Sequence, residues 1–270
     1  MWGIIPAAGN GTRIQPLAFS KELLPVGSRR DGPTERPKAI SEYLVERLII
    51  AGVRKICFVI SPGKSDIVQY FGGRVGQADI AFVVQPLAAG LCDAIFRAIP
   101  LVGSDEPVAV GLPDTVWFPE AALLDLPTDR LSFLLFPVTH PQFFDAVLTD
   151  ENGRISEIQV KSATPGSQWI WGALRAPGRT FHELHALWKA RGSRDEFLGT
   201  LVNAWIREGG EAMGVRAGTA YVDVGTLNGY REAIQLLSSP DLAARVGETF
   251  GKSRPYVSTR HSHSSGPNLK

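Results

Sequence analysis

Short apolar segments that alternate with helical patterns occupy the first half of the sequence and restrict its fold more than any other feature. Segments with the length and the valine, isoleucine, leucine and phenylalanine content of buried strands cover residues 2–6, 55–60, 80–85, 107–112 and 131–138. Apolar residues at helical spacing lie between them, over residues 40–51, 65–71 and 91–99. Because a helix that joins two strands returns the chain to the same edge of the sheet, such strands run parallel. The pattern predicts an α/β fold with a mixed, mainly parallel sheet.

The second half of the sequence has a different pattern. Residues 145–149 and 155–160 flank Asp150-Glu151-Asn152-Gly153, which is typical of a hairpin turn. Further helices are expected over 181–191, 196–208 and 227–237, a strand over 211–222, and an exposed polar loop over 28–38. We expect a single domain over residues 1–250 with an antiparallel insertion around 140–175. A flexible tail is expected over 251–270, because this segment has no apolar period.

Composition and charge exclude several classes of partner. Hydrophobic residues make up 44% of the 270 residues, enough for a sizeable core, and the net charge of +1 offers no basic surface for nucleic acid. The sequence has neither a signal-peptide pattern nor the roughly 20 consecutive apolar residues of a membrane span. The cysteines, Cys57 and Cys92, occur singly, as in reduced proteins. We therefore expect a soluble cytoplasmic protein that binds neither membranes nor nucleic acid, and the sequence leaves open whether it forms a homo-oligomer.

The first expected strand is followed by a glycine-containing sequence, Pro6-Ala7-Ala8-Gly9-Asn10-Gly11-Thr12-Arg13. Its small residues let backbone N–H groups approach an anion, and Arg13 adds a guanidinium, a combination suited to a triphosphate. A tight turn between a strand and a helix is the alternative. Ile14 at the third glycine position excludes a dinucleotide-binding fingerprint. Gly63-Lys64-Ser65 matches the end of a Walker A loop, but Phe58 stands at the required first glycine, so we interpret this match as coincidence.

The glycine sequence continues into a longer motif. The pattern G-x-G-T-R-x-x-P begins at Gly9, and after four residues the sequence Lys21-Glu22-Leu23-Leu24-Pro25-Val26 follows. This compound motif resembles the signature of the sugar-phosphate nucleotidylyltransferases, which include glucose-1-phosphate thymidylyl- and uridylyltransferases. The resemblance covers roughly residues 1–240. It implies a three-layer α/β fold with a Rossmann-like sheet of the nucleotide-diphospho-sugar transferase type, whose site lies at the carboxyl ends of the strands.

The resemblance also implies which residues bind the nucleotide and the metal. Gln85 and Gly90 match positions that read the base, although Gln85 could also be a surface amide. Asp114, after Leu112-Pro113, and Asp223, in a sequence resembling W-x-D-x-G-T, would bind Mg²⁺, although Asp223 could instead cap the helix that follows. The nucleotide-binding positions implied by the resemblance are Ala8, Gly9, Gly11, Thr12, Arg13, Gln85, Gly90 and Asp114.

The implied reaction is an in-line attack of a sugar-1-phosphate oxygen on the α-phosphorus of a nucleoside triphosphate, UTP or dTTP, with pyrophosphate as the leaving group. Such a transfer depends on positioning and charge neutralisation more than on a covalent nucleophile. Arg13 and Lys21 are the implied catalytic residues. Arg13 would stabilise the departing pyrophosphate, and Lys21 would neutralise charge near the α-phosphate.

The acceptor side matches the family less well. Lys161 and Gly172 stand at positions that hold the acceptor phosphate and the sugar, but Val160 replaces a glutamate that binds sugar hydroxyls, and Asp145 replaces a glycine. The sugar therefore differs from glucose, or Asp145 compensates for the missing carboxylate. Trp169 and Trp171 could belong to the core or stack on the sugar. Two further alternatives stay open: transfer to another phosphate acceptor, such as phosphocholine with CTP, and a non-catalytic homologue that binds nucleotide sugars.

Overall fold

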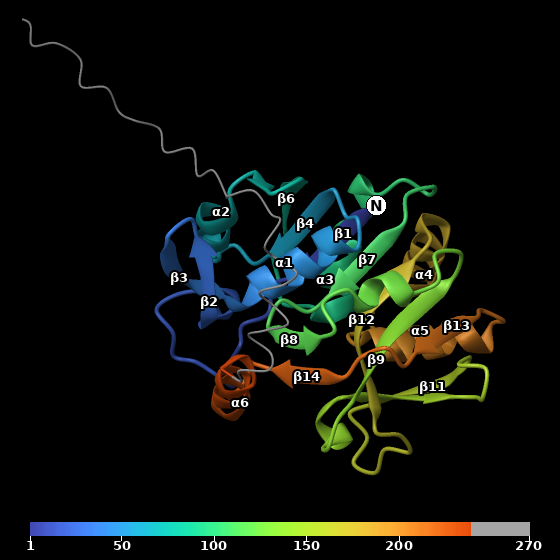
Figure 1. Cartoon of the computed structure of the whole chain (residues 1–270). Coiled ribbons are helices and arrows are strands. Elements are labelled where there is room, and N and C mark those ends of the chain that lie inside the picture. The colour runs from blue at the N-terminus through green and yellow to red at the C-terminus, as the bar shows by residue number, and fades with distance from the viewer. Residues whose placement is uncertain (239–270) are drawn as a thin grey trace, which may run out of the picture.

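A mixed sheet forms the central layer of the molecule, as seen in the computed structural model, which describes residues 1–238 (Figure 1). Its strands are β1 (Trp2–Pro6), β4 (Lys55–Ile60), β5 (Arg74–Val75), β6 (Ala78–Val84), β7 (Val108–Gly111), β9 (Leu131–Pro137), β10 (Asp145–Thr149), β11 (Ile155–Val160), β12 (Trp169–Ala176) and β13 (Ala212–Val215). The order is β11-β10-β12-β7-β1-β4-β6-β5, with β9 beside β12 and β13 beside β9. Strands β7, β1, β4 and β6 are parallel, whereas β12 pairs antiparallel with β7, β9 and β10.

Helices cover both faces of the sheet, which gives the three layers expected. The helices are α1 (Ile40–Ile50), α2 (Ser65–Phe71), α3 (Gly90–Phe96), α4 (Gly178–Ala190), α5 (Leu198–Arg207) and α6 (Leu227–Leu237). Side chains alternate between the faces along β1: Ile4 packs in a core with α3, α4 and α5, whereas Ile5 packs in a core with α1 and α2. Because both faces of the central strands are buried, their sequences are continuously apolar. The α/β fold predicted from that pattern is confirmed.

A separate two-stranded ribbon connects distant parts of the chain. Strands β8 (Thr115–Phe118) and β14 (Ala220–Asp223) pair antiparallel, with Thr115 opposite Asp223. The single strand expected over 211–222 is therefore wrong, because the chain first pairs with β9 as β13 and then leaves the main sheet to pair with β8. The change occurs near Gly218, whose N–H donates to Leu135 O at 3.0 Å.

A hairpin replaces the exposed loop expected over residues 28–38. Strands β2 (Pro25–Asp31) and β3 (Thr34–Ala39) pair antiparallel around Gly32, which has φ +60°. Diagonal side-chain contacts link the two strands, although Arg29 lies directly opposite Arg36: Ser28 donates a hydrogen bond to Glu35, and Arg36 Nε lies 3.1 Å from Asp31 Oδ2. The polarity of the segment thus predicted that it is exposed, but it did not predict that the backbone forms two paired strands.

Other expected elements lie close to their predicted positions. The hairpin β10–β11 turns at Gly153, with φ +81°, and extends the main sheet together with β12, which was not predicted. Short 3-10 helices occur at Lys21–Leu23, Ile99–Leu101, Ala122–Asp125 and Pro141–Phe143. Within residues 1–238 no helix combines the length and apolar content that crossing a bilayer requires. The expected tail over 251–270 lies outside the described residues.

The strand order places a crevice at the end of β1. From β1 the chain runs outward to β4 and β6 on one side, and later returns to β7 on the other side of β1. At such a switch point the loops after neighbouring strands diverge and leave an opening at the carboxyl ends. The loops after β1 and β7 carry the glycine sequence and Asp114, respectively.

Candidate active site

A cleft of about 230 Å³ opens at this switch point and collects most of the charged residues that the motifs indicated. Its lining residues are Pro6, Gly9, Arg13, Lys21, Glu22, Leu112, Pro113, Asp114, Thr115, Phe144, Asp145, Lys161, Trp171, Tyr221 and Asp223. They come from segments far apart in the sequence that meet where β1, β7, β12 and β14 end or bend. We call this space the cleft.

The glycine loop after β1 is shaped by its contact with Lys21. Gly11 has φ +63°, and a Cβ atom there would lie 2.7 Å from Lys21 Cδ. Both the positive φ and the close approach require glycine. The lysine side chain thus passes directly over the loop into the cleft, where its Nζ lies 2.5 Å from Asp114 Oδ2.

Lys21 and Asp114 form a mostly buried ion pair, with side chains 15% and 14% exposed. Burial lowers the pKa of Lys21, but the charge and hydrogen bond of Asp114 outweigh it and raise that pKa above its usual value. Burial would raise the pKa of Asp114, but Lys21 outweighs this effect and lowers it. Both groups are therefore charged at neutral pH.

The ribbon β8–β14 brings Asp223 beside Asp114. Asp223 Oδ2 lies 3.3 Å from Arg13 Nη2, its Oδ1 accepts a hydrogen bond from Gly225 N at 2.7 Å, and Val224 N donates to Asp114 O at 2.8 Å. A Cβ atom on Gly225 would lie 2.8 Å from Asp223 Oδ1, 2.9 Å from Arg13 Nη2 and 3.4 Å from Asp114 Oδ2. Two carboxylates and a guanidinium thus face the space that this glycine leaves open.

The donor set in this space suits a hard cation. Among the described residues, no three His, Cys, Asp or Glu side chains gather into a complete metal site. Mg²⁺ does not require one, because it is held by one or two carboxylates and completed by water and substrate phosphates. Asp114 and Asp223 fit this pattern.

The acceptor side of the cleft contains a buried carboxylate. Asp145 Oδ1 is buried without a hydrogen-bond donor among residues 1–238, and the ammonium of Lys161 lies 3.9 Å away. Burial raises the pKa of Asp145. The rings of Trp171, Tyr221 and Phe144 line the same space. Lys161 has φ +47°, and its Nζ donates to a backbone carbonyl at 2.9 Å.

Asp145 and Val160 are opposite each other in the β10–β11 register. Val160 packs against α5, where a Cβ atom on Gly199 would meet its Cγ2 at 2.8 Å, and it does not line the cleft. Asp145 thus brings a carboxylate into the cleft from β10, whereas the side chain at position 160 of β11 faces α5.

Several residues indicated by the sequence lie outside the cleft lining. They are Ala8, Gly11, Thr12, Gln85, Gly90 and Gly172. Gln85 is buried, and its Nε2 donates to Gly90 O at 3.2 Å and Asp93 Oδ2 at 2.7 Å. Close packing favours glycine at positions 90 and 172. A Cβ atom on Gly90 would lie 2.7 Å from Glu196 Cα, and one on Gly172 would lie 2.5 Å from the Tyr221 ring.

Sequence reasoning did not identify every residue of the cleft. Glu22 lies inside the motif at a position to which the resemblance assigns no role, and Phe144 and Tyr221 are cleft residues that no motif position indicates. Lys64, beneath the glycine loop, was set aside with the Walker A match, although its position between glycine and serine was visible.

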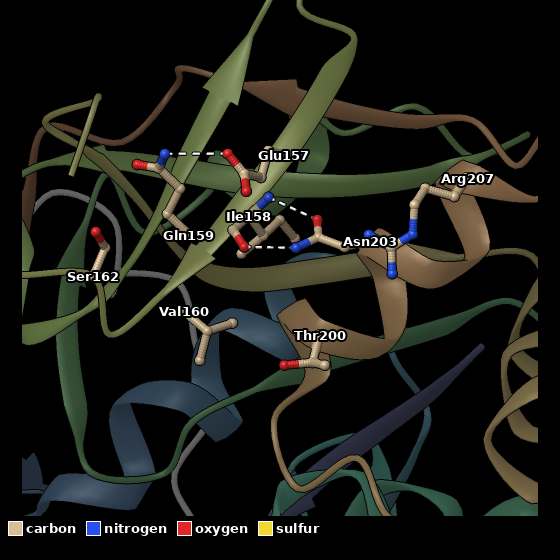
Figure 2. Close-up of a pocket in the computed structure, with 8 residues that line it drawn as sticks. All are labelled: Glu157, Ile158, Gln159, Val160, Ser162, Thr200, Asn203 and Arg207. Carbon is tan, nitrogen blue, oxygen red and sulfur yellow. Dashed lines mark hydrogen bonds between the residues drawn. The ribbon is translucent and has the colours of Figure 1, made fainter. Parts of the chain in front are cut away.

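A second, shallow groove of about 410 Å³ lies between β11 and α5 (Figure 2). Asn203 donates to Ile158 O and accepts from Ile158 N, both at 2.8 Å, and so satisfies part of the edge of β11. Glu157, Gln159 and Arg207 lie along its rim (Figure 2). Of the positions that the motifs indicated, this groove is lined by Val160, whereas the charged residues Arg13, Lys21, Asp114, Asp145, Lys161 and Asp223 line the cleft, so the cleft is the candidate active site.

Comparisons with known proteins show what the chain is similar to. A family model described as Nucleotidyl transferase matches residues 2–239. The glucose-1-phosphate thymidylyltransferase of Mycolicibacterium smegmatis is 27% identical over 256 residues, covering 90% of this chain and 84% of the relative. That of Neisseria meningitidis is 26% identical over 254 residues, covering 88% and 83%. The UTP-bound UGPase from Acinetobacter baumannii shares the fold, with a TM-score of 0.70 at 20% identity over 92% of this chain and 97% of that chain.

Proposed function

Since the chain belongs to the nucleotidyl transferase family, we propose that it transfers a nucleotidyl group from a nucleoside triphosphate to a sugar-1-phosphate and releases pyrophosphate. The family resemblance predicted from the motif that begins at Gly9 is thereby confirmed. The observation that carries the proposal is the convergence of Arg13, Lys21, Asp114 and Asp223 in one cleft beside the glycine loop. UTP and dTTP are the proposed donors, in line with the names of the relatives.

The nucleotide side of the cleft supplies charge neutralisation. Lys21 lies on the cleft floor and is proposed to hold the α-phosphate and the incoming acceptor phosphate. Arg13, whose side chain is 61% exposed, lies nearer the opening and is proposed to bind the departing pyrophosphate. Fixed cations of this kind stabilise a phosphoryl-type transition state without a covalent intermediate. We propose that Gly9 and the other glycine-loop positions bind the phosphates, and that Gln85 and Gly90 read the base.

Asp114 and Asp223 are proposed to bind Mg²⁺, and in doing so to release Lys21 and Arg13 toward the phosphates. When bound there, the metal would neutralise phosphate charge and orient the oxygens for in-line attack. Replacing Lys21 and Arg13 by the metal ion as partners of the two carboxylates costs little, because each carboxylate keeps a cation beside it.

The acceptor is proposed to be held by Lys161 through its phosphate and by Asp145 through a donor group. A carboxylate oxygen that is buried without a donor is costly, and a ligand hydroxyl would satisfy it. Gly172 is proposed to act indirectly, by letting the Tyr221 ring pack against β12 at the wall of the cleft.

The same observation favours a second candidate acceptor, a phosphorylated compound with a cationic group. Asp145 among the rings of Trp171, Tyr221 and Phe144 provides both a negative charge and aromatic faces. Phosphocholine, with CTP as its nucleotide donor, and the amino-sugar phosphates are acceptors of this class. A non-catalytic homologue is less well supported, because a protein that only binds would not need the full set of cations and carboxylates.

The proposed partners are small molecules, and the proposed location is the cytoplasm. Cys57 and Cys92 are free and buried, and burial raises the pKa of each thiol to about 12. Such thiols are little ionised and persist in a reducing compartment.

A matrix of substrates tests the function. Pyrophosphate release is measured with UTP, dTTP, CTP, ATP and GTP against hexose-1-phosphates, amino-sugar-1-phosphates and phosphocholine, with and without Mg²⁺. We expect Mg²⁺-dependent release with one donor and acceptor class, and Asp223→Asn to lower turnover by roughly 10²-fold. Glu157→Gln, in the β11–α5 groove, is the matched control and is expected to retain full turnover. No release from any pair, or an unaffected Asp223→Asn variant, would refute the proposal.

A further inference from the structure

Lys64 lies directly beneath the glycine loop, at the start of α2. Its Nζ donates to Ala7 O at 2.6 Å and Gly9 O at 2.8 Å, and to both carboxylate oxygens of Glu22 at 2.7 and 2.8 Å. Lys64 is 9% exposed and Glu22 is fully buried. An ammonium has three donors, and here the two carbonyls and the carboxylate take all of them. Lys64 therefore has no donor left for a substrate.

These bonds fix the direction of the loop's peptide groups. In a trans peptide, the carbonyl oxygen and the next residue's N–H point in opposite directions. With the carbonyls of Ala7 and Gly9 directed at Lys64, the N–H groups of Ala8 and Asn10 point away from it. Neither N–H donates a hydrogen bond to another group in the part of the chain that the structure describes. Gly9 itself lines the cleft, so the loop's outer surface faces the substrate space.

We propose that Lys64, paired with Glu22, is a positioning residue that holds the glycine loop in the conformation that binds the triphosphate. The inference rests on the proposed function, because it concerns the same cleft. The ammonium of Lys64 also neutralises the carboxylate of Glu22, the residue next to Lys21. Glu22 therefore does not weaken the attraction of Lys21 for phosphate. The Gly-Lys-Ser sequence therefore serves a phosphate-binding loop from below, whereas the lysine of a Walker A loop contacts the phosphates itself.

The design of the test follows from the burial of the pair. Removing Lys64 alone would leave Glu22 as an unpaired buried charge and endanger folding, whereas replacing both charges with apolar residues is often tolerated. We therefore choose the double variant Lys64→Met/Glu22→Leu. The matched control is Lys38→Met/Glu46→Leu, which removes another largely buried lysine–glutamate pair that joins β3 to α1 and does not line the cleft.

The two directions of the reaction separate loop positioning from general damage. The Lys64 double variant is expected to raise the KM for nucleoside triphosphate and, in reverse, for pyrophosphate by about tenfold, the effect of losing one well-oriented hydrogen bond. The KM values for the sugar-1-phosphate and the nucleotide sugar should change less than about twofold. The control variant should leave all four values unchanged. Equal increases in all four, or no change in the phosphate values, would overturn the inference.

A second variant and a binding measurement keep the outcome decisive. Lys64→Gln/Glu22→Gln keeps an amide donor near the loop and should raise the KM for the triphosphate by an intermediate amount. This variant also tests the inference if the first variant does not fold. Calorimetric titration with inorganic tripolyphosphate measures the loop without turnover. If the wild type binds tripolyphosphate but turns over no substrate pair, the proposed function alone is refuted. The role of Lys64 then still requires that both variants bind tripolyphosphate more weakly than the wild type. Binding equal to wild type in both variants would refute the role of Lys64.

Discussion

Charged side chains in the cleft neutralise one another in pairs. The pairs are Lys21 with Asp114 at 2.5 Å, Arg13 with Asp223 at 3.3 Å and Lys161 with Asp145 at 3.9 Å. An unpaired charge in a partly buried space is costly, so each contact offsets part of the cost of holding its two charges in the cleft. Each pair joins a cation proposed to bind phosphate to a carboxylate proposed to bind a metal or the acceptor. Substrate binding then exchanges partners and exposes no bare charge.

Asp145 provides the sharpest test among single residues. Asp145→Asn keeps the shape of the side chain but removes the charge, so kcat/KM for the preferred acceptor should fall by roughly 10- to 100-fold, as for the loss of one charge-assisted hydrogen bond. The KM for the nucleoside triphosphate should not change. Steady-state kinetics with varied acceptor and fixed triphosphate measure both.

Two further variants indicate what Asp145 recognises. Lys161→Ala should weaken acceptor use far more than triphosphate use. Val160 lies opposite Asp145 on β11 but packs against α5 and does not line the cleft, so Val160→Glu should not improve the use of glucose-1-phosphate if Asp145 has taken over hydroxyl recognition. If Asp145→Asn leaves acceptor kinetics unchanged while Val160→Glu improves them, Asp145 does not compensate for the missing glutamate.

At the scale of elements, the sequence predicted local structure better than distant pairing. The apolar period located β1, β4, β10 and β11 within the sheet, because each pattern reflects which faces of its own strand are buried. It did not predict β8 or the division between β13 and β14, because these depend on pairing across about a hundred residues. That pairing brings Asp223 to Asp114. The motif indicated both residues through family resemblance, whereas only the ribbon explains their contact.

The amino ends of the strands are tied by Glu106, on the edge of the sheet opposite the cleft. Its carboxylate accepts from Lys55 Nζ at 2.5 Å, Trp2 Nε1 at 3.2 Å and Gly103 N at 3.2 Å. The hydrogen bonds from Lys55 and Gly103 lower the pKa of Glu106 to about 2. Because the folded pKa lies below the unfolded one, near 4.3 for a glutamate, this stabilisation is present above that value and is lost as the pH falls toward 2.

Glu106→Gln should therefore lower stability at pH 7 and make it less dependent on pH between about 4.5 and 2. The effect is modest, because a third of the side chain is exposed and solvent screens the charge. Urea unfolding at a series of pH values gives the two slopes, with Glu151→Gln in the exposed β10–β11 turn as control. Parallel curves for wild type and Glu106→Gln would show that Glu106 contributes nothing to acid sensitivity.

At the scale of the whole molecule, α6 packs outside the main sheet against two segments that lead into the cleft. It follows β14 directly and packs beside the β2–β3 hairpin (Figure 1). Ala233 is fully buried there, and Tyr230 Oη donates to Pro25 O at 3.1 Å. The helix thus joins the segment that carries Asp223 to the segment that follows Lys21. Both halves of the proposed nucleotide site are linked through this contact.

The extent of the domain can be tested by truncation. The family model ends at residue 239, and the described core clusters include residues as far as Leu237, so we propose that residues 1–250 contain the complete domain. A chain ending at residue 250 should retain its Tm and its pyrophosphate release. A chain ending at Thr226 should lose stability, because it lacks the buried contacts of α6, and for a domain of this size each 1 kcal/mol corresponds to roughly 2–4 °C. Differential scanning calorimetry with and without nucleoside triphosphate measures the Tm of both chains. A pyrophosphate-release assay measures the activity of the chain ending at residue 250. A Tm that falls as far in the 250-residue chain as in the shorter one would place residues 251–270 within the folded domain and contradict the boundary.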